Sequence, residues 1–265
     1  MTPEATIPDL FDLTSKTALI SGASGWLGGA MSRALAEAGA HVITTSRDRD
    51  RARDTAAALP LTGKNTHHGV AMDHLDEDSI ERGFAEALAH TGRIDILVNN
   101  GHAANGSDLH SVTADEFHRT LGNATGYFLL ARRLRDHAVA RGGGASIVLI
   151  GSMYGVVGSY PDAYDGIVPA SPVAYHALKG GIVHMARHLA VYWAKDGVRV
   201  NCLSPGPFPG PAAPPEMVER LVAKSPMGRM GRPEELKGAL VFLSSDASSY
   251  VTGQNLLVDG GWTAW

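Results

Sequence analysis

The sequence of 265 residues contains a single cysteine, Cys202, so no disulfide can form within the chain. It also lacks any run of about 18 consecutive apolar residues, which argues against a helix that spans a bilayer. The opening segment, residues 1–9, is acidic and interrupted by proline, unlike a secretory signal. These absences predict a protein of the reducing cytoplasm with no membrane partner.

An excess of charge of one sign is absent too. Lys and Arg number 23 and Asp and Glu number 27, which leaves a formal net charge of −4. This balance is too even for a protein that binds nucleic acid or an anionic membrane, so a small-molecule partner is expected. Apolar residues make up 44% and charged residues 19% of the chain, which allows a sizeable core and excludes a disordered or fibrous protein.

Short apolar, β-branched segments alternate along the chain with segments of helical length and composition. Strands are expected at 16–21, 41–45, 66–72, 94–99, 146–152, 198–204 and 255–259, and helices at 27–38, 49–59, 76–90, 115–141, 173–196, 216–224 and 233–244. Helices between strands predict βαβ units and a parallel sheet. We expect residues 1–15 to be an irregular lead-in. Residues 16–265 should form a single doubly wound (Rossmann) α/β domain with about seven strands.

A glycine-rich turn lies between the first expected strand and the first expected helix. It reads Ser-Gly-Ala-Ser-Gly-Trp-Leu-Gly-Gly from Ser21 to Gly29. Glycine lets the backbone approach a pyrophosphate, whose charge then lies at the helix N-terminus. Glycines occur in many turns, but this position makes the turn a dinucleotide-binding signal. The residues expected to contact the cofactor here are Gly22, Ser24, Gly25, Trp26 and Leu27.

The end of the second expected strand carries Ser46 and Arg47. An acidic residue at this position would bind the ribose 2′-hydroxyl of NAD, whereas an arginine accommodates the 2′-phosphate of NADP. Charge-assisted hydrogen bonds then predict roughly ten- to a hundredfold preference for NADP(H) over NAD(H). The alternative is that Arg47 belongs to a solvated helix start, together with Arg49, Arg51 and Arg53.

From this point the chain resembles the short-chain dehydrogenase/reductase family over residues 12–262. Tyr-x-x-x-Lys alone is a common pattern, but several motifs in the family's order are specific. They are the glycine turn, Asp73-His74, Asn99-Asn100-Gly101-His102, Asn123-Ala124-Thr125-Gly126, Ile150-Gly151-Ser152, Tyr175-His176-Ala177-Leu178-Lys179, Pro205-Gly206 and Val258-Asp259-Gly260-Gly261. The C-terminal sequence and segment 225–235 are similar to those of gluconate 5-dehydrogenases and related sugar or polyol reductases.

The resemblance implies that Asn123, Ser152, Tyr175 and Lys179 are catalytic. Tyr175 and Lys179 are i and i+4 on one expected helix, so the ammonium should lower the phenol pKa from its ordinary value of about 10. The resemblance also assigns Lys179 to the nicotinamide ribose, Ser152 to the substrate oxygen, and Asn123 to a water that continues a proton relay. Without the cofactor turn, the same residues could be a packing aromatic, a surface charge, a strand cap and an interior helix residue.

Further cofactor contacts follow from the resemblance. They are Asp73, His74, Asn100, Gly101, His102, Tyr175, Lys179, Pro205, Gly206 and Phe208. The chain departs from the family at Trp26, where glycine is usual, and at Gly210, where a hydroxyl is common. His102 also replaces a glycine, so its imidazole either reaches the nicotinamide or the substrate, or faces solvent.

Residues 153–174 separate Ser152 from Tyr175 and include an insert at about 156–172. Its hydroxyls and carboxylates suit a polyhydroxy substrate, although the insert could equally pack over a neighbouring segment. The expected substrate contacts are Ser152, Tyr154, Tyr164, Tyr175 and His102. A Pro- and Gly-rich segment at about 205–225 is expected to form a lid over cofactor and substrate.

The helix expected at 173–196 is apolar nearly all round, so more than its sheet-facing side should be buried. With the family resemblance, this predicts a homotetramer, or at least a dimer. His184 and His188 also share a face of this helix, but no third ligand is evident and no metal is expected.

Three functions compete. The first is an NADP(H)-dependent oxidoreductase that interconverts a secondary alcohol and a ketone on a sugar-derived or polyol substrate. The second is a 3-oxoacyl-thioester reductase, which is disfavoured because segments 155–172 and 205–217 hold no Lys or Arg to attract an acidic carrier protein. The third is a nucleotide-sensing protein without turnover, although such a protein has no need for all the catalytic residues.

Overall fold

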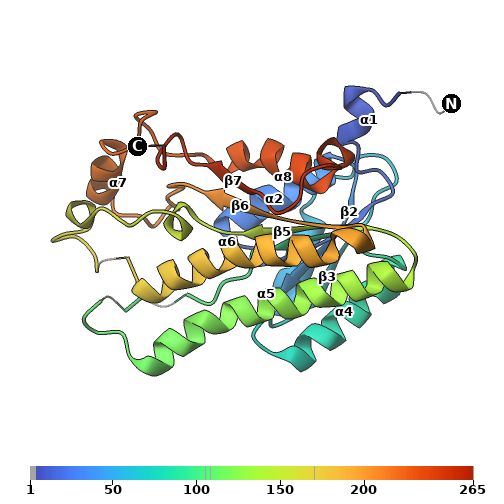
Figure 1. The fold of residues 1–265 in the computed structure, drawn as a ribbon, viewed down its shortest axis with the longest axis horizontal. Helices are drawn as coiled ribbons and strands as arrows, with labels where there is room; N and C mark the ends of the chain where they lie inside the picture. The colour runs from blue at the N-terminus through green and yellow to red at the C-terminus, as the bar shows by residue number, and fades with distance from the viewer. Residues whose placement is uncertain (1–3, 105, 108, 170, 265) are drawn as a thin grey trace.

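The sheet at the centre of the protein is parallel, as the alternating sequence predicts. The computed structural model describes residues 4–104, 106–107, 109–169 and 171–264. The strands are β1 (Thr17–Ser21), β2 (His41–Ser46), β3 (His67–Ala71), β4 (Ile96–Asn99), β5 (Ala145–Ile150), β6 (Val198–Pro205) and β7 (Asn255–Val258). They form one seven-stranded sheet in the order β3-β2-β1-β4-β5-β6-β7 (Figure 1). The chain order reverses direction between β1 and β4, so the prediction of a doubly wound domain is confirmed.

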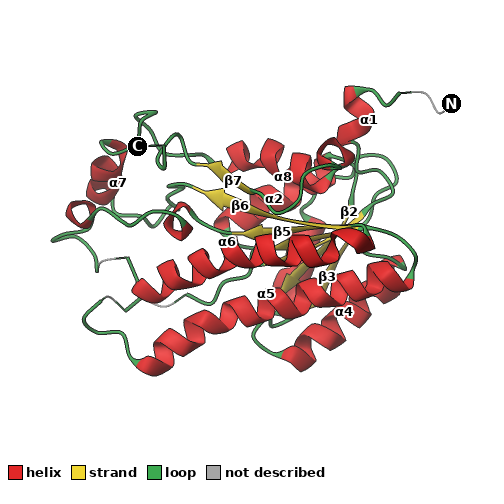
Figure 2. Cartoon of the chain, in the orientation of Figure 1, coloured by secondary structure: helices red, strands yellow, loops and turns green. Residues whose placement is uncertain are grey.

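Helices cover both faces of this sheet. They are α1 (Ile7–Phe11), α2 (Trp26–Glu37), α3 (Arg49–Ala57), α4 (Glu77–Thr91), α5 (Ala114–Ala140), α6 (Val173–Trp193), α7 (Pro215–Val222) and α8 (Lys237–Ser244). Figure 2 shows α2 and α8 on one side of the strands and α4, α5 and α6 on the other. Short 3₁₀ turns are η1 (Met153–Gly155), η2 (Pro161–Ala163), η3 (Ala194–Asp196), η4 (Pro233–Leu236) and η5 (Asp246–Ser248).

Strand β1 shows how one sheet supports two hydrophobic cores. Its successive side chains point to opposite faces. Ala18 and Ile20 pack in the core beneath α2 and α8, whereas Leu19 packs in the core beneath α4, α5 and α6. Because both faces are covered, the central strands are mostly apolar on both sides and do not alternate regularly with polar residues.

Most element boundaries differ from the sequence prediction by a few residues, and three of the differences concern the lead-in, α6 and Ser152. The lead-in contains the helix α1, because Thr6 and Asp9 form a capping box at its start. The helix expected to continue to 196 ends as an α-helix at Trp193 and closes in η3. The strand expected to reach Ser152 ends at Ile150, so Ser152 instead begins η1 in an extended conformation.

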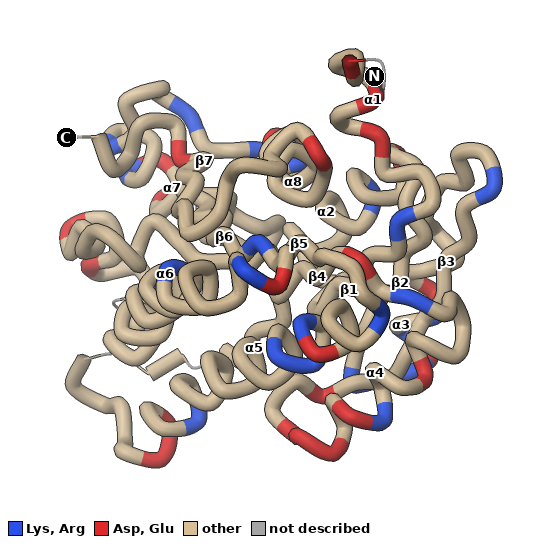
Figure 3. The backbone as a smooth tube through the Cα atoms, turned by 45° about the vertical axis from the view of Figure 1, so that its right-hand side comes forward, with Lys and Arg blue, Asp and Glu red and all other residues tan. Residues whose placement is uncertain are grey.

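Charged positions of opposite sign lie among one another along the chain, as Figure 3 shows. None of the helices in the described ranges is long and apolar enough to cross a membrane. This arrangement agrees with the even charge balance of the sequence.

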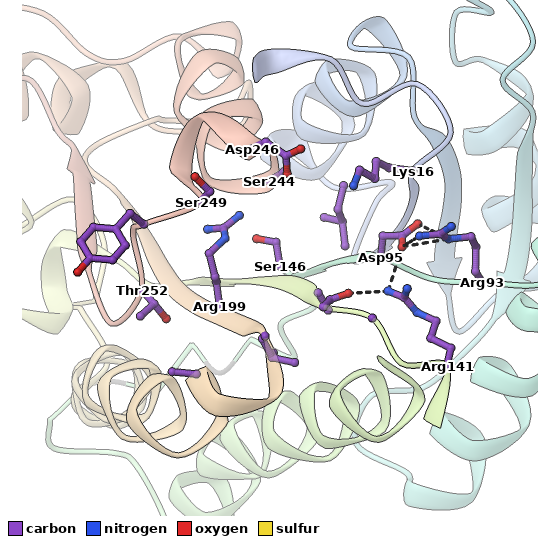
Figure 4. Close-up of a pocket in the computed structure, with 18 residues that line it drawn as sticks. Lys16, Arg93, Asp95, Arg141, Ser146, Arg199, Ser244, Asp246, Ser249 and Thr252 are labelled. Atoms are coloured by element: carbon purple, nitrogen blue, oxygen red, sulfur yellow. Dashed lines mark hydrogen bonds and ion pairs between the residues drawn. The ribbon is translucent and has the colours of Figure 1, made fainter. Parts of the chain in front are cut away.

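A cavity of about 830 Å³ opens at the edge where the strands begin (Figure 4). Its arginines are engaged in holding the fold. Arg199 donates to the carbonyl oxygens of Leu243 and Ser245 at the end of α8, and to that of Val251 in the loop before β7, at 3.0 to 3.1 Å. Arg141 donates to Asp95 at 3.0 Å. Arg199 therefore stabilises the C-terminus of α8, where the helix dipole is negative, and Arg141 pairs with a buried carboxylate.

Candidate active site

The opposite edge, where the strands end, holds a cavity of about 420 Å³. Loops that follow β1, β2, β3 and β4 meet there, as expected at a topological switch point. The structure brings together many of the predicted cofactor residues in its lining: Gly22, Ser24, Gly25, Trp26, Leu27, Ser46, Arg47, Asp73, His74, Asn100, Gly101 and His102. The cavity therefore has the location and lining that a dinucleotide requires.

The glycine turn leaves room for backbone contacts at the start of α2. Gly22 has φ +64°, and a Cβ on Gly28 would lie 2.1 Å from the Gly22 carbonyl oxygen. Gly25 is the N-cap of α2 and provides no side-chain hydrogen bond. The first backbone N–H groups of α2 therefore remain available to an anion, where the helix dipole also favours negative charge. This turn fits a pyrophosphate.

The arginines after β2 divide into two groups. Arg47 and Arg51 line the cavity. Arg49 pairs with Glu86 on α4, and Arg53 lies 3.9 Å from Asp50. The first group lines the cavity, although Arg51 belongs to the helix start that the sequence left as an alternative, so the phosphate role of Arg47 stays a prediction. The placement fits a phosphate on the ribose.

The loop after β4 is anchored to the glycine turn. The Ser21 hydroxyl accepts hydrogen bonds from the backbone N–H of Asn100 at 3.0 Å and of Gly101 at 2.9 Å. The Asn100 side chain donates to the carbonyl oxygen of Gly22 at 3.0 Å. These bonds join the ends of β1 and β4 into one floor of the cavity.

Lys179 lies fully inside the protein on α6. Its Nζ donates to the carbonyl oxygen of Ile150, at the end of β5, at 2.8 Å. Burial lowers the pKa of Lys179 to about 8. The same Nζ lies 5.5 Å from the centroid of the Tyr175 ring, so α6 presents both residues to the end of β5.

The pKa of Tyr175 moves in the direction opposite to the prediction. Burial raises it above the ordinary value, the hydroxyl of Ser152 offsets part of this rise as a hydrogen-bond partner, and the nearby Tyr164 adds to it. The expectation that Lys179 lowers this pKa is wrong for the chain alone. Loss of water around the phenol raises the pKa of Tyr175 by more than the Lys179 ammonium can lower it. That ammonium is itself buried and donates to a backbone carbonyl.

Asn123 is 1% exposed within α5, and protein groups use all its side-chain hydrogen bonds. Its Oδ1 accepts from Ala103 N–H and from the imidazole Nε2 of His74, both at 2.8 Å. Its Nδ2 donates to the carbonyl oxygens of Thr120 at 2.8 Å and Ala103 at 3.3 Å. The side-chain amide therefore has no capacity left for a water, and the role of Asn123 in a proton relay stays a prediction.

His102 faces Tyr175. The two ring centroids lie 5.3 Å apart with the planes at 72°. More than a third of the His102 surface stays open, and its ring also lines the cavity. Desolvation by the surrounding protein, with smaller contributions from Lys179 and His74, lowers its pKa to about 4. The imidazole is thus neutral at physiological pH and can donate or accept a hydrogen bond.

Tyr154 and Tyr164 form a hydroxyl pair beside Tyr175, with the two oxygens 2.5 Å apart. Burial raises the pKa of both phenols, so both remain neutral. The ring of Tyr154 stacks on His176 at 4.6 Å. The sequence prediction missed His176, whose position next to Tyr175 was the available signal.

The insert is tied to α7. Lys224 pairs with the carboxylate of Asp162 at 2.6 Å, and Arg220 donates to the carbonyl oxygens of Asp162 and Asp165 at 3.0 and 2.7 Å. The insert therefore packs over a neighbouring segment, which was one of its two expected roles. Asp162 is engaged by Lys224, whereas Tyr154 and Tyr164 remain beside Tyr175.

The remaining predicted residues lie apart from the cavity described above. Gly206 follows β6, and its N–H donates to the carbonyl of Val258 at 2.9 Å. Phe208 lines a separate cavity of about 120 Å³ and packs closely on Gly231. Cofactor contacts at Pro205, Gly206 and Phe208 stay predictions. His184 and His188 are exposed on α6, and no group of three metal-ligating side chains occurs among the residues that the structure describes.

Comparisons with known proteins agree with this geometry. A family model described as "Enoyl-(Acyl carrier protein) reductase" matches residues 22–263. The chain is 34% identical to gluconate 5-dehydrogenase of Gluconobacter oxydans, covering 97% of this chain and 98% of that protein. It is 35% identical to galactitol 2-dehydrogenase (L-tagatose-forming) of Cereibacter sphaeroides, covering 97% and 98%. A gluconate 5-dehydrogenase structure from Burkholderia cenocepacia, in complex with NADP and tartrate, matches with a TM-score of 0.86 at 30% identity, covering 98% and 100%.

Proposed function

The chain belongs to the short-chain dehydrogenase/reductase family, and from this premise we propose that it interconverts a secondary alcohol and a ketone with NADP(H) on a sugar-derived or polyol substrate. One observation carries the proposal. Tyr175, Ser152 and Lys179 meet at the end of β5, and His102, which lines the dinucleotide-shaped cavity, packs against Tyr175.

The nicotinamide cofactor, when bound, supplies or accepts the hydride. The protein handles the proton. Tyr175 is buried and protonated, so its hydroxyl can donate a proton to a carbonyl oxygen in reduction and take it back in oxidation. Ser152 lies next to this hydroxyl and can hold the same substrate oxygen, while Lys179 supplies positive charge that stabilises the phenolate after transfer.

Arg47 and Arg51 support NADP(H) as the cofactor, because both line the cavity beside Ser46. Arg47 also has no ion pair with any of the described residues. A guanidinium without a carboxylate partner is suited to a phosphate group. We assign the 2′-phosphate of NADP(H) to this end of the cavity.

Two observations support a sugar-derived or polyol substrate. The relatives named above act on gluconate and galactitol. In this chain, Tyr154, Tyr164 and His102 present neutral hydrogen-bonding groups around Tyr175. Hydroxyl and imidazole groups that can both donate and accept match the hydroxyls of a polyol.

The second candidate is a 3-oxoacyl-thioester reductase, since the description of the matching family model names an acyl carrier protein as the carrier of the substrate. Carrier proteins that deliver thioesters are recognised through charge complementarity. The basic side chains of α7 do not offer it, because Lys224 pairs with Asp162 and Arg220 with Glu216. This observation favours a sugar or polyol over a carrier-bound thioester as the substrate.

The protein is further proposed to form a homotetramer, or at least a dimer, in the cytoplasm. On α6, Val191 and Tyr192 are 77% and 62% exposed, an apolar pair that a second subunit could cover. Cys202 is a buried free thiol, which suits a reducing compartment.

The test is cofactor turnover followed by absorbance, with NADPH and NADH, on a panel of keto-sugars, polyols, sugar acids and a 3-oxoacyl thioester. We expect turnover of a sugar-type ketone with NADPH and its loss in Tyr175→Phe, which lacks the proton donor. Activity with NADH alone would refute the role of Arg47. If the whole panel is silent while NADPH still binds, the proposed reaction fails and a nucleotide sensor becomes the better explanation.

A further inference from the structure

His74 occupies a narrow space between α5 and the loop after β4. A Cβ added to Gly126, on α5, would lie 1.8 Å from the His74 carbonyl oxygen. A Cβ added to Gly101 would lie 3.0 Å from the imidazole Nδ1. Because both neighbours are glycine, His74 can pack against backbone on two sides, and its side chain is confined.

The orientation of the His74–Asn123 hydrogen bond follows from the surrounding groups. The backbone N–H of Ala103 can only donate, so the Asn123 atom that it contacts at 2.8 Å is the acceptor Oδ1. The His74 Nε2 lies 2.8 Å from that same oxygen and must therefore carry its hydrogen. The Ala103 N–H on Oδ1 and the Thr120 carbonyl on Nδ2 set which way this amide points, and the His74 Nε2–H adds a second donor that holds Oδ1 in place.

The hydrogen bonds of Asn123 affect the position of His102, because they hold the loop that carries it. Asn100 and Gly101 are held by the Ser21 hydroxyl on one side, and Ala103 is held by Asn123 on the other. His102 is the one residue between these two anchors. Its position against Tyr175 thus depends on Asn123 keeping its amide oriented.

We propose that His74 is a positioning residue, whose Nε2–H orients Asn123 and thereby holds His102 against Tyr175. The inference rests on the proposed oxidoreductase function, and it gives the His74 side chain a role besides the predicted cofactor contact. His74 itself touches no reacting group in the structure. Its effect on turnover passes through Asn123 and the 100–103 loop.

The decisive comparison is His74→Leu against His74→Gln. Leucine fills similar space without a donor, whereas the glutamine Nε2 can occupy the place of the imidazole Nε2 and donate to Asn123. We expect His74→Leu to lower kcat about tenfold, which is the size of loss expected when a catalytic group loses its orientation. The kcat of His74→Gln should stay within about threefold of the wild-type value. His68→Leu is the matched control, since His68 lies on β3 and stacks on His90, away from the cavity.

A second readout separates positioning from general stability. The pKa of His102, followed by NMR of its imidazole, should rise further from about 4 toward its ordinary value in His74→Leu than in His74→Gln. Both variants lack the His74 imidazole, which itself lowers this pKa, and only the glutamine can still donate to Asn123. If His74→Leu does not fold, His74→Asn replaces it, since the shorter side chain cannot reach Asn123.

Wild-type kcat in the leucine variant, together with a His102 titration equal in the leucine and glutamine variants, would overturn the inference. Equal losses in the leucine and glutamine variants would also overturn it, because they would point to packing alone. A wild-type enzyme that turns over no substrate would refute the proposed function instead, and the His102 titration would still decide the role of His74.

Discussion

Lys179 places an ammonium group where little water can solvate it. Burial lowers its pKa to about 8, from an ordinary value near 10.4. Below about pH 8 both the folded and the unfolded chain bind this proton, so the folded state carries the full cost of the buried charge. As pH rises from about 8 to about 10.4, the unfolded chain binds more of the proton and the cost disappears.

Lys179→Met should therefore separate stability from activity. We expect it to abolish turnover and to raise the unfolding midpoint at pH 7 by a few degrees, because a buried charge is replaced by an apolar side chain of similar length. Thermal unfolding at pH 7 and near pH 10 checks the sign. A lower midpoint in the variant at pH 7 would show that the bond from Nζ to the Ile150 carbonyl stabilises the fold more than burial destabilises it.

The pKa of His102 makes a second prediction at the residue scale. It lies at about 4 in the folded protein, below the ordinary value of about 6.5. Between these values the unfolded chain binds a proton that the folded chain does not, so stability falls as pH decreases through this window. His102→Asn should lose less of its unfolding midpoint than the wild type between pH 7 and pH 4.5. Equal losses would contradict the assignment.

Arg47 tests cofactor choice. Arg47→Ala should lower kcat/KM for NADPH by about ten- to a hundredfold and leave the value for NADH unchanged, because only NADPH has the 2′-phosphate. Arg49→Ala is the matched control, since Arg49 pairs with Glu86. Steady-state kinetics with both cofactors measure the effect, and equal losses for the two would remove the phosphate role.

At the scale of elements, α5 carries two glycines one turn apart with different surroundings. A Cβ on Gly122 would lie 3.8 Å from the Leu75 side chain, an ordinary contact, whereas a Cβ on Gly126 would collide with the His74 carbonyl at 1.8 Å. Gly122→Ala should stabilise the protein by up to about 1 kcal/mol, because alanine is the better helix former. Gly126→Ala should destabilise it by about 1–3 kcal/mol and reduce kcat, since α5 must move away from His74. Chemical denaturation of both variants decides between these outcomes.

Among the elements, some features can be predicted from sequence patterns and others cannot. The capping box of α1 was readable in Thr6 and Asp9, yet the segment was expected to be irregular. The join between the insert and α7 was not readable. It depends on Arg220 and Lys224 meeting Asp162 across a long stretch of chain, and only folding brings them together.

At the scale of the whole molecule, the exposed apolar pair on α6 predicts self-association. A Val191→Asp, Tyr192→Asp double variant should shift the protein from a tetramer or dimer to a smaller species, because charge replaces apolar surface that a second copy would bury. Light scattering at micromolar protein measures the mass. A wild-type monomer under these conditions would refute the oligomer.

The resemblance to a known family predicted most of the residues that gather at the carboxyl ends of the strands. The sequence by itself determined the parallel α/β domain and the glycine turn. These follow from periodicity and from local order along the chain, which a sequence displays directly. Only the tertiary structure decided the direction of the Tyr175 pKa, the saturated amide of Asn123 and the seat of His74 between two glycines. Each depends on burial and on contacts within a few ångströms between segments far apart in the chain, and no local pattern records these.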